Sequence, residues 1–323
     1  MALLTIDNLH VRFRTPAGLL HAVNGVNLQV DRGEIVGLVG ESGCGKSVTA
    51  RAIMRLLPEH RSAQVSGRVV WRDEDLLAKS ETDMVRLRGA DLAMIFQDPL
   101  SALNPVMRIG DQVIEGPRQR EKLSRQRARA RAIEWLDHVG IPDAAARVDQ
   151  YPHTFSGGMR QRVVMATALS GSPDLLIADE PTTALDVTIQ AQLLERLRTL
   201  QAETGTAILF ITHDLAVVAQ LCHRVAVMYA GRIVEQATVA ELFAHPRHPY
   251  TRALLNSTPV PGQRERLEPI PGAPPDGLHP FSGCPFADRC PHAIPACDLP
   301  PPLEDVTSTH RVACHRHEEL ADP

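Results

Sequence analysis

The sequence predicts an α/β fold that is interrupted by a helical insertion and followed by a proline-rich C-terminal extension. Residues 1–97 alternate short apolar strands with one helix, and residues 98–172 are mostly helical in pattern. Residues 173–255 return to alternating strands and helices, which is typical of a sheet covered by helices. We therefore expect an α/β domain over residues 1–255, with a helical subdomain at about 98–172, and a separate extension over residues 256–323.

A glycine-rich loop at residues 40–47 joins an apolar strand to the first predicted helix. Glycines let consecutive backbone N–H groups face one anion, and the helix N-terminus adds a partial positive charge. Lys46 would reach the β- and γ-phosphates of ATP, and the Ser47 hydroxyl would ligate Mg²⁺. The expected ATP contacts are Gly40, Glu41, Ser42, Gly43, Cys44, Gly45, Lys46, Ser47 and Val48.

An apolar run at residues 175–178 ends in two carboxylates, Asp179 and Glu180. A buried parallel strand that delivers acids at its C-terminal edge has this pattern. We expect Asp179 to hold Mg²⁺ and Glu180 to polarise the attacking water. Without the glycine-rich loop, acidic surface residues at the end of a strand would be the better interpretation.

A second glycine-opened helix begins at Ser156, Gly157 and Gly158. Because the chain's own nucleotide phosphates are assigned to the first loop, this helix N-terminus is expected to face a nucleotide held by another subunit. Two such pairs of loops would form a head-to-tail dimer, with Gln161 among the residues that contact the partner-bound ATP. The alternative interpretation is a turn with a helix N-cap.

With these motifs the sequence resembles the ATP-binding cassette (ABC) ATPases, and among them the D-type ATP-binding subunits of the dipeptide, oligopeptide and nickel permeases. The resemblance covers essentially the whole chain. It implies a RecA-like core with an antiparallel β subdomain and a helical subdomain. Residues 95–99 match the family's Q-loop, residues 181–186 its D-loop, and residues 208–214 the strand that ends in its switch histidine.

The resemblance assigns a role to one residue in each of these motifs. It implies that Gln97 senses Mg²⁺ and water and leads toward the membrane subunits. It also implies that Asp186 lies at the dimer interface and that His213 contacts the γ-phosphate. Phe13 is the nearest match to the family's adenine-stacking aromatic, although a core strand position is the alternative. Cys44 replaces a frequent serine at a position that mainly contributes its backbone N–H.

Composition limits the function classes. The net charge of −4 argues against a nucleic-acid-binding surface over the whole protein. No apolar run approaches ~18 residues, and the N-terminus has no export pattern, so we expect neither export nor membrane spanning. Residues 118–131 hold seven basic residues against the single acid Glu121, which is typical of a solvated helix face. Contact with lipid headgroups or nucleic acid is the alternative for this run.

The extension contains four of the six cysteines, namely Cys284, Cys290, Cys297 and Cys314. Disulfides are disfavoured in the reducing cytosol, and the spacing lacks the paired C-x₂-C of structural zinc. Permease-family members with similar cysteine patterns carry a 4Fe-4S cluster, so the resemblance implies a cluster here, with a four-thiolate Zn²⁺ site as the alternative. The nearby His292, His310 and His315 are candidate substitute ligands.

The sequence thus predicts the ATP-hydrolysing subunit of an importer for dipeptides or oligopeptides. The resemblance implies a second, different ATPase subunit, two transmembrane permease subunits and an extracytoplasmic solute-binding protein, with this chain peripheral at the cytoplasmic face of the inner membrane. Import of nickel or another small solute is the first alternative, and a soluble ABC ATPase acting on nucleic acid or the ribosome is the second. A phosphate-loop kinase would lack the second glycine-opened helix and the switch histidine.

Overall fold

The computed structural model describes residues 2–58, 62–98, 102–183, 185–258 and 269–320, and it divides into two compact units. The helical unit comprises residues 31–34 and 79–210, and the phosphate-loop unit comprises residues 2–30, 35–78 and 211 onward. Pro99 of the predicted Q-loop, Ala184 of the predicted D-loop and the predicted turns at Pro259, Pro261 and Gly262 lie outside the described residues.

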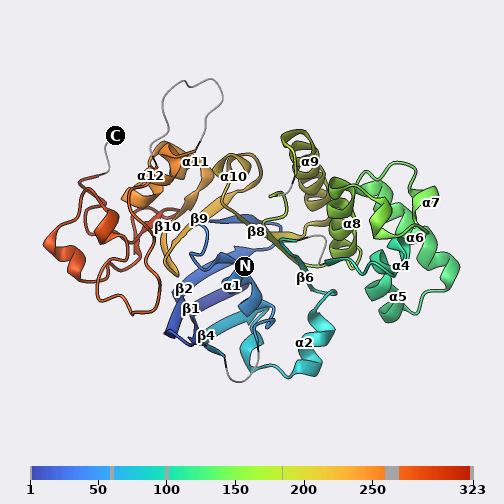
Figure 1. Cartoon of the computed structure of the whole chain (residues 1–323), viewed down its shortest axis with the longest axis horizontal. Helices are drawn as coiled ribbons and strands as arrows, with labels where there is room; N and C mark the ends of the chain where they lie inside the picture. The colour runs from blue at the N-terminus through green and yellow to red at the C-terminus, as the bar shows by residue number, and fades with distance from the viewer. Residues whose placement is uncertain (1, 59–61, 99–101, 184, 259–268, 321–323) are drawn as a thin grey trace. The chain divides into compact units, whose positions relative to one another are not determined.

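The phosphate-loop unit contains an antiparallel sheet with strand order β2-β1-β4-β5 (Figure 1). Strands β1 and β4 pair from Leu4 opposite Trp71 to Phe13 opposite Ala63, and both Leu4 and Trp71 are buried. The bounds are β1 Ala2–Thr15, β2 Gly18–Asp31, β4 Ala63–Trp71 and β5 Glu74–Asp75, followed by the 3₁₀ turn η1 Leu76–Ala78. Alternating buried and exposed residues along β1 and β2 explain why one face of this sheet is apolar.

A second set of strands in the same unit has the order β11-β12-β10-β9-β3. Every residue of β3 is buried, as expected for an apolar strand with a parallel neighbour, and it pairs in parallel with β9. The strands are β3 Ile35–Val39, β9 Arg224–Tyr229, β10 Arg232–Thr238, β11 Glu304–Asp305 and β12 Arg311–Val312. The helices of this unit are α1 Lys46–Ile53, α10 Leu215–Leu221, α11 Val239–Ala244 and α12 Pro249–Asn256.

The helical unit carries the parallel strands β6 and β7, with β8 beside β7. These strands are β6 Leu92–Ile95, β7 Leu175–Asp179 and β8 Ala207–Thr212, of which β8 continues into the other unit at residue 211. The helices are α2 Glu81–Leu87, α4 Ile109–Val113, α5 Glu115–Glu121, α6 Arg125–His138, α7 Ala144–Arg147, α8 Gly157–Leu169 and α9 Val187–Thr204, with the 3₁₀ turn η2 Pro152–Thr154.

Burial within the helical unit agrees with the sequence pattern. Leu193, Leu194 and Leu197 of α9 are buried. Six of the seven basic residues between 118 and 131 are exposed, and Arg131 is half-buried. Their exposure on α5, on α6 and at the bend between them agrees with a solvated helix face. In the described ranges, no helix is both long enough and apolar enough to cross a membrane.

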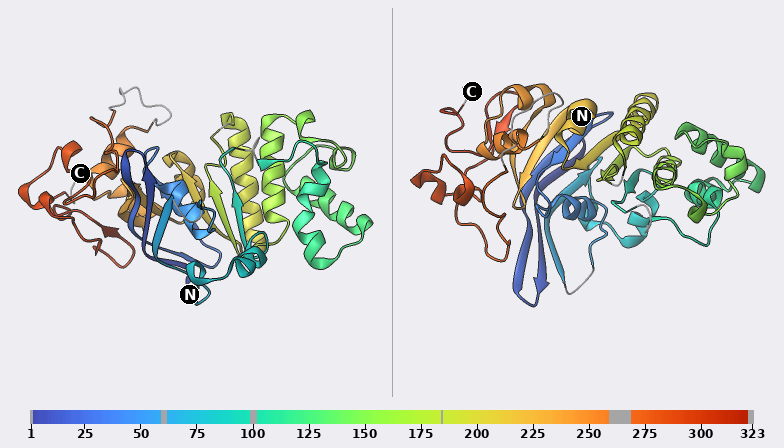
Figure 2. Two further views of the ribbon diagram at one scale, coloured as in Figure 1. Left: turned by 60° about the horizontal axis from the view of Figure 1, so that its bottom comes forward. Right: turned by 45° about the horizontal axis from the view of Figure 1, so that its top comes forward.

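The C-terminal extension adds β11 and β12 to the edge of the sheet at β10. Its other regular elements are the 3₁₀ turns η3 Ala287–Arg289 and η4 Pro295–Asp298. Figure 2 shows the extension, in red, beside the orange helices α11 and α12. The extension therefore packs on the phosphate-loop unit with little secondary structure of its own, as its many prolines predict.

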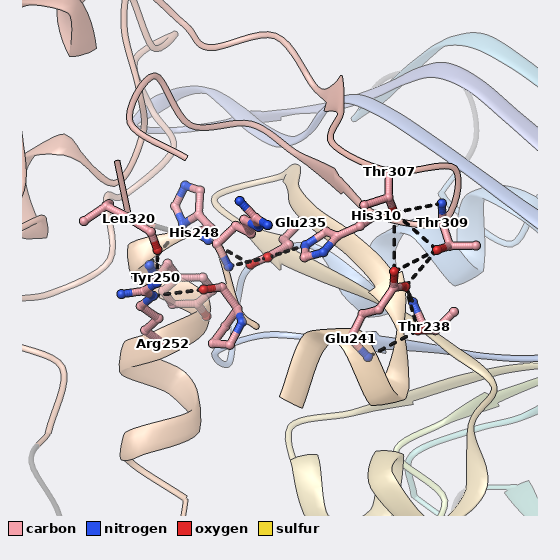
Figure 3. A network of polar contacts seen from close by, with 12 residues as sticks. Glu235, Thr238, Glu241, His248, Tyr250, Arg252, Thr307, Thr309, His310 and Leu320 are labelled. Carbon is pink, nitrogen blue, oxygen red and sulfur yellow. Dashed lines mark hydrogen bonds and ion pairs between the residues drawn. The ribbon is translucent and has the colours of Figure 1, made fainter. Parts of the chain in front are cut away.

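A buried carboxylate, Glu235 of β10, fastens the extension to the sheet (Figure 3). Its Oε1 lies 2.7 Å from Nε2 of His310 and accepts from the Arg247 backbone N–H at 2.7 Å, and its Oε2 accepts from the His248 N–H at 3.0 Å. The Glu235 and His310 side chains are 0% and 3% exposed, so water cannot replace these bonds. Removing one partner would leave a buried polar group without its hydrogen bonds.

A second contact lies at the surface, where Glu241 of α11 meets the extension (Figure 3). Its carboxylate accepts from the hydroxyls of Thr307 and Thr309 at 3.3 and 2.9 Å. Together with Thr238 it also forms a capping box at the start of α11. These hydrogen bonds lower the pKa of Glu241, the one from Thr238 having the largest effect. The Glu241 carboxylate thus both caps α11 and binds the extension.

We predict a pH dependence of stability from His248, the N-cap of α12. Its Nδ1 accepts from the Tyr250 N–H at 3.0 Å, and burial lowers its pKa from 6.5 to about 4. As pH falls from 6.5 to about 4, the unfolded chain binds a proton at His248 that the folded chain does not, so the free energy of unfolding decreases.

The variant His248→Asn keeps an acceptor for the Tyr250 N–H and removes the titration. Urea unfolding at about pH 7.5 and about pH 5 should show a larger loss of stability in the wild type than in the variant. Equal losses in the two proteins would contradict this assignment.

Candidate nucleotide-binding site

The loop at residues 40–47 connects β3 to α1. At two of its positions there is no space for a Cβ atom, so only glycine fits. A Cβ on Gly40 would lie 2.1 Å from the Met228 carbonyl oxygen, and one on Gly45 would lie 2.4 Å from the Ala22 carbonyl oxygen. Both glycines also have positive φ, of 152° and 107°. The loop is thus packed closely against the backbone of β9 and β2.

Lys46 is only 4% exposed, although it carries a charge. Its Nζ donates to the carbonyl oxygens of Gly40 at 2.8 Å and Glu41 at 3.0 Å. These bonds compensate the ammonium group for the water that it loses on burial. They hold the charge at the loop, where phosphate oxygens would meet it.

Both backbone groups of Cys44 make hydrogen bonds in this region, and its contact with a nucleotide stays a prediction. Its carbonyl oxygen accepts from the Gly231 N–H at 2.9 Å, and its N–H donates to the Glu41 carbonyl oxygen at 3.3 Å. Burial raises the pKa of the thiol despite the neighbouring Lys46, so the side chain stays neutral. Ser42 and Gly43 are exposed, whereas Ser47 and Val48 are half-buried at the start of α1.

Sequence reasoning missed the residues that anchor Glu41. The guanidinium of Arg289, in η3, makes two bonds to the Glu41 carboxylate, at 2.7 and 3.1 Å. The hydroxyl of Tyr250, in α12, accepts from the Glu41 N–H at 2.8 Å. No local sequence pattern marks either residue, because Arg289 lies 248 positions from Glu41.

Within the helical unit, the predicted Mg²⁺ ligand Asp179 precedes the predicted catalytic residue Glu180, which Gln97 contacts. Asp179 ends β7 at 1% exposure, and Glu180 follows it, also buried. The Glu180 Oε2 accepts from Gln97 Nε2 at 3.3 Å and from the Thr183 hydroxyl at 2.9 Å. Glu180 has a φ of 47°, which costs a non-glycine residue about 1 kcal/mol. A carboxylate held by two donors in a strained turn is typical of a functional position.

The remaining predicted residues of these motifs lie at helix starts. His213 is exposed between β8 and α10, and Asp214 caps α10 by accepting from the N–H groups of Ala216 and Val217. Asp186 is exposed and caps α9 by accepting from the Ile189 N–H at 3.0 Å. Each of these loops is therefore fixed by the cap of the helix that follows it.

The second glycine-opened helix is α8, and Ser156 is its N-cap, accepting from the Met159 N–H at 3.3 Å. Ser156 and Gly157 are exposed, so this helix N-terminus faces outward. A Cβ on Gly158 would lie 3.0 Å from Cγ2 of Ile189. Gln161 is buried and donates to the Pro181 carbonyl oxygen at 2.6 Å. Its contact with a partner-bound nucleotide stays a prediction.

Phe13 lies on β1 opposite Ala63 and is half-buried. Leu9 and Val11, which precede it on the same strand, are fully buried. Both interpretations of Phe13, adenine stacking and a strand position at the edge of the core, stay open.

All six cysteines lie in the described part of the chain and are free. A small cavity of about 20 Å³ is lined by the four cysteines of the extension, Cys284, Cys290, Cys297 and Cys314, with His292 and His315 at its walls. Burial raises the pKa of three of these thiols, that of Cys314 to about 11. His310, the third candidate substitute ligand, bonds Glu235 instead.

The described residues contain no set of three or more His, Cys, Asp or Glu side chains already arranged to hold a metal ion. Burial is the main cause of the raised pKa of Cys314, and Cys284, Cys290 and Cys297 add smaller electrostatic contributions. The structure thus places the four predicted ligands around one cavity.

Comparison with known proteins identifies the family. Residues 23–183 match the ABC transporter family, and residues 234–297 match the C-terminal region of oligopeptide/dipeptide transporters. The dipeptide transport ATP-binding protein DppD of Bacillus subtilis is 49% identical over 321 residues, covering 99% of this chain and 96% of DppD. The oligopeptide transport ATP-binding protein OppD of the same organism is 50% identical over 313 residues, covering 96% and 87%.

Two solved structures have the same fold. A dimer of the ATP-binding cassette MJ0796 bound to ADP and Pi matches with a TM-score of 0.65 and 25% identity, covering 73% of this chain and 98% of that one. CbiO1 of Clostridium perfringens, part of the ABC transporter complex cbiONQ, matches with a TM-score of 0.64 and 30% identity, covering 75% and 91%. The chain therefore belongs to the ABC transporter ATP-binding family and is an ATPase, which confirms the predicted fold class and resemblance.

Proposed function

We propose that this chain is the ATP-binding and ATP-hydrolysing subunit of an importer of dipeptides or oligopeptides. The observation that carries this proposal is that about half of the residues are identical to those of peptide-transport ATP-binding proteins, over nearly the full length of the chain. The match to their C-terminal region strengthens it, because this segment lies beyond the general ATPase family match at residues 23–183.

The phosphate-loop unit would bind the nucleotide. Its backbone N–H groups and Lys46 would hold the phosphates, and Ser47 at the start of α1 would ligate Mg²⁺ together with Asp179 and Gln97. A serine hydroxyl, a carboxylate and an amide are oxygen ligands of the kind that Mg²⁺ prefers. When bound, Mg²⁺ would neutralise charge on the phosphate oxygens.

Glu180 would orient and polarise the water that attacks the γ-phosphate. The donors on its Oε2, Gln97 and Thr183, support this role because they fix the direction of the carboxylate. We propose that His213 contacts the γ-phosphate from its exposed position before α10. These roles separate binding, which rests on Lys46, from hydrolysis, which rests on Glu180.

A second ATPase subunit would complete each site. The exposed N-terminus of α8, with Ser156 and Gly157, supports contact with a partner-bound nucleotide, and the exposed Asp186 supports an interface role. We propose that the partner is a related but different chain and that the pair works with two transmembrane permease subunits and an extracytoplasmic solute-binding protein. The chain would then be peripheral at the cytoplasmic face of the membrane.

For the extension, we propose a 4Fe-4S cluster bound by Cys284, Cys290, Cys297 and Cys314. The shared cavity supports this, and so do the four free thiols, which are the ligands that such clusters take. The cluster would tie together a segment with few regular elements and little core. A four-thiolate Zn²⁺ site is the alternative at the same residues. The proposed domain division at residues 255 and 256 falls at the end of α12.

We predict that Glu180→Gln keeps Mg-ATP binding but slows hydrolysis by about 10²- to 10⁴-fold, the usual effect of losing a general base. The measurement is phosphate release by the purified complex in which the partner's own site is inactivated. Glu203→Gln on α9 is the matched control, because Glu203 is exposed on the same unit. Wild-type turnover in Glu180→Gln would contradict the assignment.

We predict that anaerobic purification yields about four irons and about four acid-labile sulfides per chain. Cys290→Ser should lose this iron while ATP binding through Lys46 survives. Cys222→Ala is the control, since Cys222 is a buried thiol outside the extension whose pKa burial raises to about 12. One zinc without sulfide in the same preparation would exclude the cluster.

A further inference from the structure

The side chain of Arg289 connects the C-terminal extension to the phosphate loop. Arg289 donates to the Glu41 carboxylate from both terminal guanidinium nitrogens, Nη1 to Oε2 at 2.7 Å and Nη2 to Oε1 at 3.1 Å. The Arg289 side chain is 5% exposed and that of Glu41 is 24% exposed. A bidentate pair with this little exposure is more rigid and less screened than a surface ion pair.

Other contacts, independent of Glu41, also fix the Arg289 side chain. Its Nε donates to the Pro271 carbonyl oxygen at 2.8 Å, and its Nη1 also bonds the Tyr229 hydroxyl at 3.2 Å. The guanidinium lies 5.7 Å from the ring centre of Tyr229 and 5.9 Å from that of Phe286. These contacts fix the guanidinium, so little conformational entropy is lost when it holds Glu41.

A second anchor acts on the backbone of the same loop residue. The Tyr250 hydroxyl accepts from the Glu41 N–H at 2.8 Å, and Tyr250 is 0% exposed. Its ring packs 4.6 Å from that of Tyr229 and 5.4 Å from that of Phe286. The side chain and the backbone of Glu41 are therefore both tied to one aromatic cluster from β9, α12 and the extension.

Glu41 places a negative charge in the loop that is proposed to bind the triphosphate. An unpaired carboxylate there would repel the nucleotide, and a mobile one could also compete for Lys46. On the basis of the proposed ATP site, we infer that Arg289 is a positioning residue for ATP binding. It neutralises Glu41 and fixes its carboxylate through two hydrogen bonds, so the extension contributes to the nucleotide site.

The test measures ATP binding and steady-state hydrolysis by the full chain in its complex. Arg289→Ala should raise the Kd and KM for ATP about tenfold while kcat at saturating ATP stays near the wild-type value. Arg289→Lys, which keeps the charge, should recover part of this loss. Arg311→Ala is the matched control in the same extension, because Arg311 pairs with Asp305 at the surface and should leave both constants unchanged.

The double variant Glu41→Gln with Arg289→Ala distinguishes a charge effect from general loosening. If Arg289 acts by neutralising Glu41, removing the carboxylate should restore much of the affinity that Arg289→Ala loses. The inference is overturned if the two substitutions lower ATP affinity additively, or if Arg289→Ala leaves KM unchanged. It is also overturned if Arg289→Ala lowers only kcat, in proportion to the amount of protein that fails to fold. Absence of ATP binding by the wild type would instead refute the proposed function.

Discussion

The phosphate loop is held by close packing against the backbone of neighbouring strands. Gly40 and Gly45 lie where a Cβ would meet the carbonyl oxygens of Met228 and Ala22. This contact leaves room only for glycine, and it also sets where Lys46 enters α1. The buried ammonium then bonds the loop's own carbonyl oxygens. The position of β9 and β2 thus determines the geometry that a triphosphate would meet.

The extension attaches through polar contacts more than through a core. Its two short strands continue the sheet at β10, and buried Glu235 receives three hydrogen bonds from chain segments on both sides of α12. Buried polar networks of this kind are costly unless complete, and a completed one specifies a single arrangement. The extension is therefore fixed in register by Glu235 and His310, and Arg289 is held at the phosphate loop by its own contacts with Pro271 and the aromatic cluster.

The sequence was informative where a function depends on neighbouring residues. The glycine-rich loop, the acids after β7 and the serine cap of α8 are local patterns, and each lies on the element that its pattern predicts. The alternation of strands and helices likewise predicted the α/β core. Burial of Leu193 and Leu197 followed from helical spacing alone.

The contacts that the sequence did not reveal join residues far apart in the chain. Glu41 and Arg289 are separated by 248 positions, and Glu235 and His310 by 75. An isolated arginine or histidine has no local signature of its partner, so the sequence does not reveal the bond between His310 and Glu235. The cysteines were recognisable as a group by their clustering, but only the folded chain brings Cys314 to the cavity of the other three.

Hydrogen–deuterium exchange with and without Mg-ATP tests the central claim most directly, because it reports on the loop and the extension in one experiment. The account predicts that ATP slows amide exchange in residues 40–47 and also in residues 286–290, which contain the arginine that holds Glu41. Unchanged exchange in residues 40–47 at saturating Mg-ATP would contradict it.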